Sequence, residues 1–452
     1  MKVNVSILRP YNPYEFAGIV LSYGSSEVIE VPLHIDYRNL YEFTKLQDGI
    51  AFDLFTVASI VYGIDILLPR ETTGFDGWSR EIEVCFPVEY VDEFNCGKDA
   101  LEKTLRFLTG DLWSVSFESR TIRRLYKFGR RQKAHGESFR QRYKVVNLFS
   151  GGMDSLIGAI NQLHNSNDEV CLVSHTDSVF KGAKTDQEEI LKEIKKKYRH
   201  YYHIPTRVDI GKRDIHGNEY EKETTLRSRS FLFLSMAVLV ADSIDEAMSV
   251  HIPENGTISL NYPLTPSRRS SCSTRTTHPH FLILMEDFLK VIGLNHPIIN
   301  DYQTCTKGEM VAGCADRDLL LRAYPYSCSC GKRGTRKDIR DDAHASHCGV
   351  CMPCIYRRAA LNKIDQTEEV GTDIFNAQKR GIMSIPDMPA LACYLRKDLN
   401  LQEIERGLLV NGPLPLDKLE EYAKVVMRTR DEIKQWIRDD ASDEVKNLFG
   451  VK

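Results

Sequence analysis

The chain has 452 residues, of which 42% are hydrophobic and 27% charged, so it has room for two or three domains and the composition of an ordinary globular protein. Its formal net charge of −3 gives no overall reason to bind nucleic acid, so any basic surface must be local. No apolar run approaches the length of a membrane span, and the first residues lack a signal-peptide core. We therefore expect a cytoplasmic protein with no membrane partner.

Residues 1–120 alternate between short apolar runs and turn residues. The period-2 pattern predicts half-buried strands near residues 3–8, 17–23, 27–33 and 80–88. Residues 52–69 read as one helix followed by a strand, and residues 100–110 as a helix that ends at Gly110. We expect a separate strand-rich α+β accessory domain here, for recognition or scaffolding.

Residues 121–144 form a basic connector with interleaved aromatics. Its cations and aromatics are Arg123, Arg124, Lys127, Arg130, Arg131, Lys133, Arg140, Arg142 and Lys144, with Tyr126, Phe128, Phe139 and Tyr143. Such a stretch can contact nucleic acid, can close over nucleotide phosphates, or can be a solvated link between domains. We favour the solvated link and keep nucleic-acid binding through residues 123–144 as an alternative.

The most informative stretch runs from Tyr143 to Ile160. A buried-strand pattern (Val145 to Phe149) leads into Ser150-Gly151-Gly152-Met153-Asp154-Ser155 and then into a helix. Unpaired N–H groups at a helix start attract anions, and the glycines let a phosphate approach the main chain. The sequence therefore predicts a phosphate site. Ser150 and Ser155 would donate hydrogen bonds, and Asp154 would hold Mg²⁺ or orient these groups.

Strands and helices alternate beyond this loop. Strands are expected at 170–175, 206–211 and 246–252, and helices at 185–198 and 227–243, which predicts parallel βαβ units. Ligands on such sheets bind beyond the carboxyl ends of the strands. We therefore expect a substrate to meet Glu254 and Asn255 there, together with Arg275 and His278 from a segment dense in cations and hydroxyls.

A cysteine cluster is the second strong signal. Cys348, Cys351 and Cys354 follow C-x-x-C spacing, and Cys328 or Cys330 supplies a fourth thiol. Four thiolates suit tetrahedral Zn²⁺ and leave no open position, so the expected zinc site is structural. His344 and His347 are expected to lie nearby without binding. Residues 366–452 have helical periodicity and a high charge, which predicts a C-terminal helical extension.

Three motifs in this order resemble one family. They are FSGGMDS (149–155), RSRSFLFLSMA (227–237), and YSC (326–328) followed by CGVCMPCIYRR (348–358). The combination resembles the 7-cyano-7-deazaguanine synthases (QueC) of the PP-loop ATP pyrophosphatases. The resemblance implies an α/β, Rossmann-like PP-loop sheet (adenine nucleotide alpha hydrolase-like) with a zinc-binding insertion, over residues 145–365.

The resemblance also implies site residues. ATP with Mg²⁺ would be bound by Phe149, Ser150, Gly151, Gly152, Met153, Asp154, Ser155 and Leu156 together with Arg229, and Zn²⁺ by Cys328, Cys348, Cys351 and Cys354. Asp154, Ser150 and Ser155 would serve the reaction, in which ATP is split at the α-phosphate and a carboxylate is adenylated. The added N- and C-terminal segments are similar to those of QueC-like proteins in bacterial anti-phage operons such as the Qat system. This implies a defence role with protein partners from the same operon.

The chain differs from the family at positions that are expected to contact the substrate. Arg229-Ser230 replaces an Arg-Asn pair, and SHTDS (174–178) replaces a Tyr-Gly-Gln stretch. The expected function is an ATP-dependent ligase acting on 7-carboxy-7-deazaguanine or a related deazapurine, with ammonia, a protein or a nucleic acid as amine acceptor. Alternatives are a non-catalytic nucleotide-binding subunit of a defence complex and a PP-loop tRNA-modifying enzyme.

Overall fold

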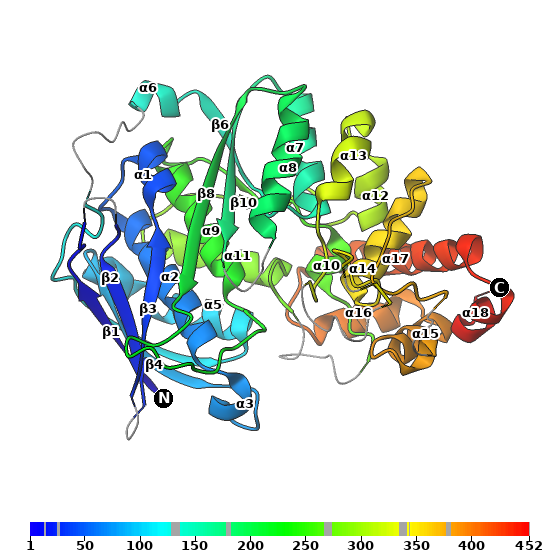
Figure 1. Cartoon of the computed structure of the whole chain (residues 1–452), viewed down its shortest axis with the longest axis horizontal. Helices are drawn as coiled ribbons and strands as arrows, with labels where there is room; N and C mark the ends of the chain where they lie inside the picture. The colour runs from blue at the N-terminus through cyan, green and yellow to red at the C-terminus, as the bar shows by residue number, and fades with distance from the viewer. Residues whose placement is uncertain are drawn as a thin grey trace.

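The computed structural model describes residues 1–12, 15–24, 28–127, 136–177, 182–265, 274–333, 341–342, 344–376 and 381–451. Its centre is a ten-stranded sheet of order β10-β9-β6-β7-β8-β3-β2-β1-β4-β5 (Figure 1). The strands are β1 (Lys2–Leu8), β2 (Gly18–Tyr23), β3 (Ile29–Asp36), β4 (Glu81–Val88), β5 (Leu112–Ser119), β6 (Tyr143–Leu148), β7 (Glu169–Thr176), β8 (Tyr201–Ile210), β9 (Val250–His251) and β10 (Ile298–Ile299). Most neighbouring strands are parallel, and the fold is α/β.

The strands from β6 to β10 form the parallel part of the sheet, as the alternation of strands and helices predicts. Successive side chains of β7 enter different cores: Cys171 and Val173 face one, and Val170 and Leu172 face the other. A strand covered on both faces is apolar throughout, which explains the unbroken run in β7. The expected strand at 246–252 is shorter in the structure, with only β9 paired.

The N-terminal segment, expected as a separate domain, continues the same sheet. β3 pairs antiparallel with β8 in the register Leu33 to Ile210, and one hydrophobic core runs beneath both halves. Residues 52–69, expected as a helix and a strand, lie almost wholly in the single helix α2 (Ile50–Leu67). α2 is long and apolar enough to cross a membrane, but 94% of that window is buried inside the fold. It is apolar all round because the sheet and α9 cover it.

Helices cover both faces of the parallel strands. On one face lie α1 (Arg38–Thr44), α2 and α9 (Arg229–Asp242), and α4 (Val91–Cys96), α5 (Lys98–Thr109) and α11 (Pro279–Val291) continue that layer. On the other lie α7 (Met153–Asn165), α8 (Ala183–Lys195) and α13 (Arg317–Ala323). α5 ends at Gly110 with φ 77°, as its sequence predicts. Short helices complete this part: α3 (Arg70–Thr73), α6 (Glu137–Arg140), α10 (Gly256–Leu260), α12 (Lys307–Ala312) and η3 (Tyr324–Tyr326).

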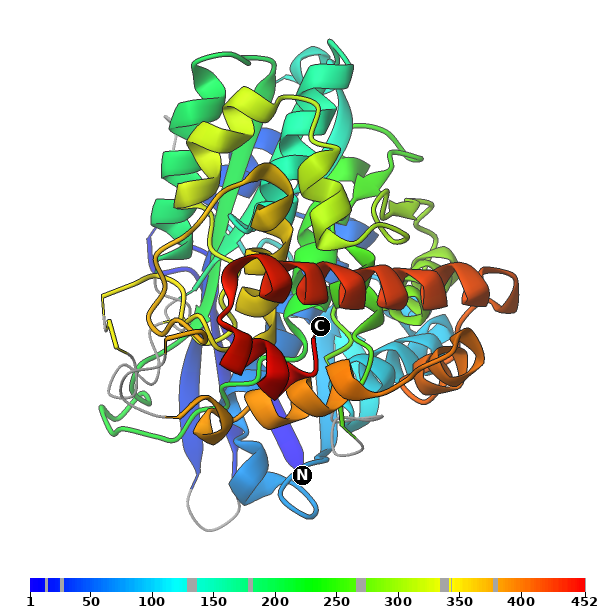
Figure 2. The same ribbon diagram turned by 90° about the vertical axis from the view of Figure 1, so that its right-hand side faces the viewer.

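The remaining helices gather beyond α10, away from β1 and β2 (Figure 1). They are α14 (Met352–Leu361), η5 (Asn362–Ile364), η6 (Ile382–Ser384), α15 (Met388–Arg396), α16 (Leu401–Leu409), η7 (Leu416–Lys418), α17 (Leu419–Asp440) and α18 (Asp443–Phe449). Most of them share a second hydrophobic core, which includes Trp436. Figure 2 shows α17 crossing this side of the molecule as one long helix.

The described part of the basic connector is tied to the fold. Tyr126 and Tyr143 are buried in the core, and Phe139 packs against Tyr143 at 5.4 Å between ring centroids. Arg142 pairs with Glu169 at 2.6 Å, and Arg140 donates to the carbonyl of Ser243. These aromatics serve packing. Arg130, Arg131, Lys133 and Phe128 lie outside the described residues.

Candidate active site and metal centre

The predicted phosphate loop joins β6 to α7. Gly151 turns the chain at φ 87°, and Gly152 precedes the first residue of α7 with no side-chain cap on the helix start. The Ser150 and Ser155 hydroxyl oxygens lie 3.2 Å apart, and the amides of Gly151 and Gly152 donate to them at 3.2 and 3.3 Å. At the start of α7 the Met153 amide donates to Ser329 Oγ at 3.5 Å, a long hydrogen bond outside the helix. The first amides of any α-helix have no partner within the helix, and such a helix start attracts anions.

Asp154 lies at the centre of a buried polar cluster. Its Oδ1 accepts a 2.5 Å hydrogen bond from Lys307 Nζ, and its Oδ2 accepts one from Asn255 Nδ2 at 2.9 Å. Asn255 Nδ2 also donates to Glu254 Oε1 at 3.2 Å. Side-chain exposure is only 3% for Lys307 and 12% for Asp154. Three segments distant in the chain thus meet at the first turn of α7.

The protonation states of the two carboxyl groups differ. Burial raises the pKa of Asp154, but the Lys307 ammonium and hydrogen bonds outweigh it and hold that pKa below its usual value. Burial raises the pKa of Glu254 well above its usual value, and the neighbouring Asp154 charge raises it further. A proton shared by this pair is therefore held by Glu254 rather than by Asp154.

A cavity of 580 Å³ opens beside this cluster. Its polar lining includes Ser150, Ser155, Asp154, Glu254, Lys307, Arg229 and Arg333. Arg333 pairs with Asp186 of α8, which also lines the cavity. Its apolar lining includes Ile258, Tyr262, Leu264, Met352, Pro353 and Tyr356. A cavity with this lining can hold a polyanion with its polar groups and a flat apolar group against its aromatic rings.

Some expected cofactor residues lie behind this cavity. Phe149 and Leu156 are fully buried in the core beneath α7, and the Phe149 amide donates to Val173 as an extension of β6. Gly151 faces Gln187 of α8, where an added Cβ would lie 3.2 Å from that side chain. These three residues shape the loop without lining the cavity.

Arg275 and His278, expected at the substrate, lie elsewhere. Arg275 Nη1 donates to the Phe107 carbonyl at 3.0 Å, and its guanidinium stacks 4.4 Å from the Phe107 ring. His278 is 1% exposed, and its Nδ1 accepts from the His280 amide at the start of α11. Burial lowers the pKa of His278 to about 3, so it stays neutral. Both residues contact Phe107 of α5, and neither is among the residues that line the cavity, which include Thr274 and Thr276 on either side of Arg275.

Two residues that line the cavity, Lys307 and Arg333, were not predicted from the sequence. Lys307 begins α12, and its only local signal is the capping box of Thr306 and Glu309, which marks a helix start. Arg333 follows the cysteine at 330 in a polar loop, and nothing nearby indicates its partner Asp186. Both are brought to the cavity by tertiary structure alone.

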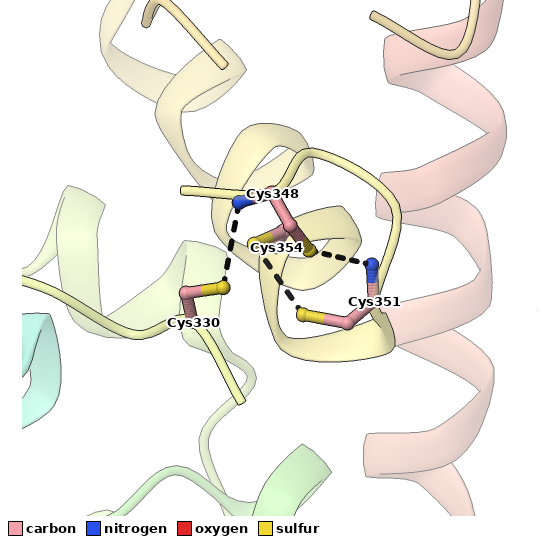
Figure 3. Close-up of side chains that lie close together, drawn as sticks. All are labelled: Cys330, Cys348, Cys351 and Cys354. Carbon is pink, nitrogen blue, oxygen red and sulfur yellow. Dashed lines mark hydrogen bonds between the residues drawn. The ribbon is translucent and has the colours of Figure 1, made fainter. Parts of the chain in front are cut away.

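Four buried cysteines form the metal centre: Cys330, Cys348, Cys351 and Cys354. Their sulfur atoms lie within 4.8 Å of one another and surround one point (Figure 3). Zn–S bonds of about 2.3 Å place tetrahedral ligands about 3.8 Å apart, and the Cys348 and Cys354 sulfurs are 3.8 Å apart. Amides of Lys332, Cys348 and Cys351 donate to sulfur, as they do to thiolates. The four residues can hold a metal ion such as zinc.

The fourth thiol comes from Cys330, which corrects the assignment of Cys328. The Cys328 amide donates to the Gly151 carbonyl at 3.0 Å, so this residue is held against the phosphate loop and lines the cavity. His347 is also outside the cluster, because its Nε2 accepts from the Ser329 amide at 3.2 Å. Residues 328–330 therefore link the loop of residues 150–155 to the cysteine cluster.

Compared with known proteins, the chain matches no protein-family model, no curated protein and no solved structure.

Proposed function

We propose that this chain is an ATP-dependent ligase of the PP-loop type that adenylates a carboxylate and passes the acyl group to an amine. The observation that carries the proposal is the buried Lys307–Asp154 pair at the first turn of α7, beside the uncapped loop and open to the cavity. A cation fixed next to the start of a helix, where the dipole favours negative charge, suits the pyrophosphate end of a nucleoside triphosphate.

Each group of residues around the cavity has its own role in the proposed adenylation. Ser150, Ser155 and the first-turn amides of α7 hold the β- and γ-phosphates. A carboxylate oxygen of the substrate attacks the α-phosphorus, the bond from that phosphorus to the bridging oxygen breaks, and pyrophosphate leaves with the electron pair. Lys307 offsets the charge that develops on the leaving group. Positioning and charge stabilisation supply the rate, without a covalent enzyme intermediate.

Asp154 and Glu254 are the residues that would hold Mg²⁺. Their carboxyl groups both line the cavity and both accept from Asn255 Nδ2, and carboxylate oxygens are ligands that Mg²⁺ takes in proteins. Bound Mg²⁺ supplies charge neutralisation on phosphate oxygens. The cysteine centre has four protein ligands and no open position, so a zinc ion there is structural.

The apolar lining of the cavity supports a planar acid as substrate. Tyr262, Met352 and Tyr356 offer flat and polarisable surfaces in the same cavity as the polar groups. This fits 7-carboxy-7-deazaguanine or a related deazapurine, with ammonia or another amine as acceptor. The proposal includes a place in an anti-phage operon, with partner proteins encoded beside it.

Pyrophosphate release tests the proposal. With ATP, Mg²⁺ and 7-carboxy-7-deazaguanine, the wild-type chain should release pyrophosphate, and Asp154→Ala should lower the rate by at least about 100-fold. Asp168→Ala, at an exposed aspartate near the end of α7, is the matched control and should keep the rate. No release with this acid would overturn the deazaguanine substrate. ATP binding without any AMP would identify a nucleotide-binding subunit instead.

A further inference from the structure

One stripe of helix α17 reaches both segments that supply partners to Asp154. Tyr422, Val425, Thr429 and Glu432 follow each other at spacings of three and four residues, so they lie on one face of the helix. All four are buried. This face meets the segment after β9, which carries Asn255, and the start of α12, which carries Lys307.

The Glu432 carboxylate accepts hydrogen bonds from the residues on either side of Lys307. Its Oε1 accepts a 2.5 Å hydrogen bond from the Thr306 hydroxyl, and its Oε2 accepts one from the Gly308 amide at 3.3 Å. A Cβ at position 308 would overlap Glu432 Oε1, so a larger residue there would displace the carboxylate from this position. The carboxylate therefore fixes the backbone from which the Lys307 side chain extends.

Thr429 and Val425 make a similar contact next to Asn255. The Thr429 and Thr257 hydroxyl oxygens lie 2.6 Å apart. A Cβ at Gly256 would lie 3.0 Å from Val425 Cγ1 and would overlap the carbonyl of Gln303. Both partners of Asp154 are thus followed directly by a glycine against which α17 packs. The same face of α17 therefore packs closely against the backbone next to both partners of Asp154.

We propose that α17 is a positioning element, in which Glu432 and Thr429 hold Lys307 and Asn255 against Asp154 and so set the affinity of the loop for pyrophosphate. The pyrophosphate part of this inference rests on the proposed function, whereas the positioning of Lys307 does not. Glu432 does not touch the cavity, so it acts only through Lys307. The C-terminal helices are then part of the site.

Two measurements on Glu432→Gln test the positioning. The variant keeps the size of the side chain but loses the charge and one acceptor. The first measurement is the rate at which an amine-acetylating reagent labels Lys307, read by mass spectrometry. Loss of the clamp should raise this rate on the order of ten-fold, because the buried ammonium is freed more often. Asp431→Asn removes an exposed carboxylate from the next position of α17 and should leave the rate unchanged.

The second measurement is the Kd of pyrophosphate by calorimetry. Glu432→Gln should weaken binding on the order of ten-fold in the wild-type background and not at all in a Lys307→Met background. Equal losses in both backgrounds, or unchanged labelling of Lys307, would overturn the positioning role. If wild type binds no pyrophosphate while the labelling rises as expected, the proposed function fails and the positioning stands. If Glu432→Gln does not fold, Thr429→Val is measured in its place, because valine keeps the shape of the threonine side chain. Thr429→Val should weaken pyrophosphate binding relative to wild type. Unchanged pyrophosphate binding in Thr429→Val would overturn the proposal.

Discussion

The Lys307 ammonium lies 2.5 Å from the Asp154 carboxylate, and both groups are nearly excluded from water. Charges buried in this way are costly to separate, because each loses its hydration and depends on the other. The pair therefore sets both the stability of the region and the charge that a ligand meets at the start of α7.

Removing the lysine should be strongly destabilising. Lys307→Met leaves Asp154 without its cation, and we expect a loss of about 3 kcal/mol in the free energy of unfolding, measured with urea. Lys195→Met, at an exposed lysine, is the control and should lose little. The double variant Lys307→Met/Asp154→Asn should recover part of the loss, because no uncompensated charge remains. A double variant less stable than the sum of the single changes would contradict the ion-pair account.

Glu254 makes stability fall as the pH rises. Its folded pKa is raised well above the ordinary value of 4.5, so above that value the unfolded chain has lost a proton that the folded chain keeps. The stabilisation is complete below the unfolded pKa and is lost as the pH rises towards the folded pKa. One proton corresponds to a fall of about 1.4 kcal/mol per pH unit. Glu254→Gln should flatten this slope in urea unfolding at several pH values, and the exposed Glu118→Gln should keep it. An unchanged slope in Glu254→Gln would show that the proton is held elsewhere.

The strand, turn and helix around residues 150–155 were predictable because they are contiguous. All three lie within residues 143–165, where an apolar run is followed by a glycine pair and a helical pattern. Lys307 is 153 residues from Asp154, and no local pattern joins them. Lys307 and Asp154 are neighbours because of the order of the strands in the sheet, and a single sequence does not show that order.

The other differences between expectation and structure have the same origin. Period-2 patterns locate β1 to β4 but do not show that β3 pairs with β8, so the sheet was divided into two domains. Arg275 and His278 suggested a ligand by composition, whereas Phe107 of α5 covers them. For the cysteines, spacing alone left 328 and 330 equivalent. The hydrogen bond from the Cys328 amide to Gly151 decides between them.

Asp65 of α2 fixes the start of α9. Its Oδ2 accepts from the amide and the hydroxyl of Ser228, both at 2.8 Å, and its Oδ1 from Arg80 at 2.5 Å, all buried. Asp65→Asn removes a charge that Arg80 needs, and we expect a loss of about 3 kcal/mol in unfolding free energy. Ser228 precedes Arg229, so pyrophosphate binding should weaken as well. The exposed Asp36→Asn is the control. Full stability of Asp65→Asn would show that the other partners of Arg80 suffice.

The metal centre should respond differently to the two neighbouring cysteines. Cys330→Ser removes a ligand from the buried cluster, and we expect the zinc content, measured by plasma mass spectrometry, to fall from about one per chain to near zero. Cys328→Ser should keep its zinc, because that thiol lies outside the cluster. The amides of Cys328 and Ser329, which precede the ligand Cys330, donate to the Gly151 carbonyl and to His347 Nε2, so loss of the metal should also weaken pyrophosphate binding. If Cys328→Ser loses its zinc and Cys330→Ser keeps it, the ligand assignment is reversed.

If Cys330→Ser loses its zinc but still binds pyrophosphate as wild type does, the metal centre and the loop of residues 150–155 are independent.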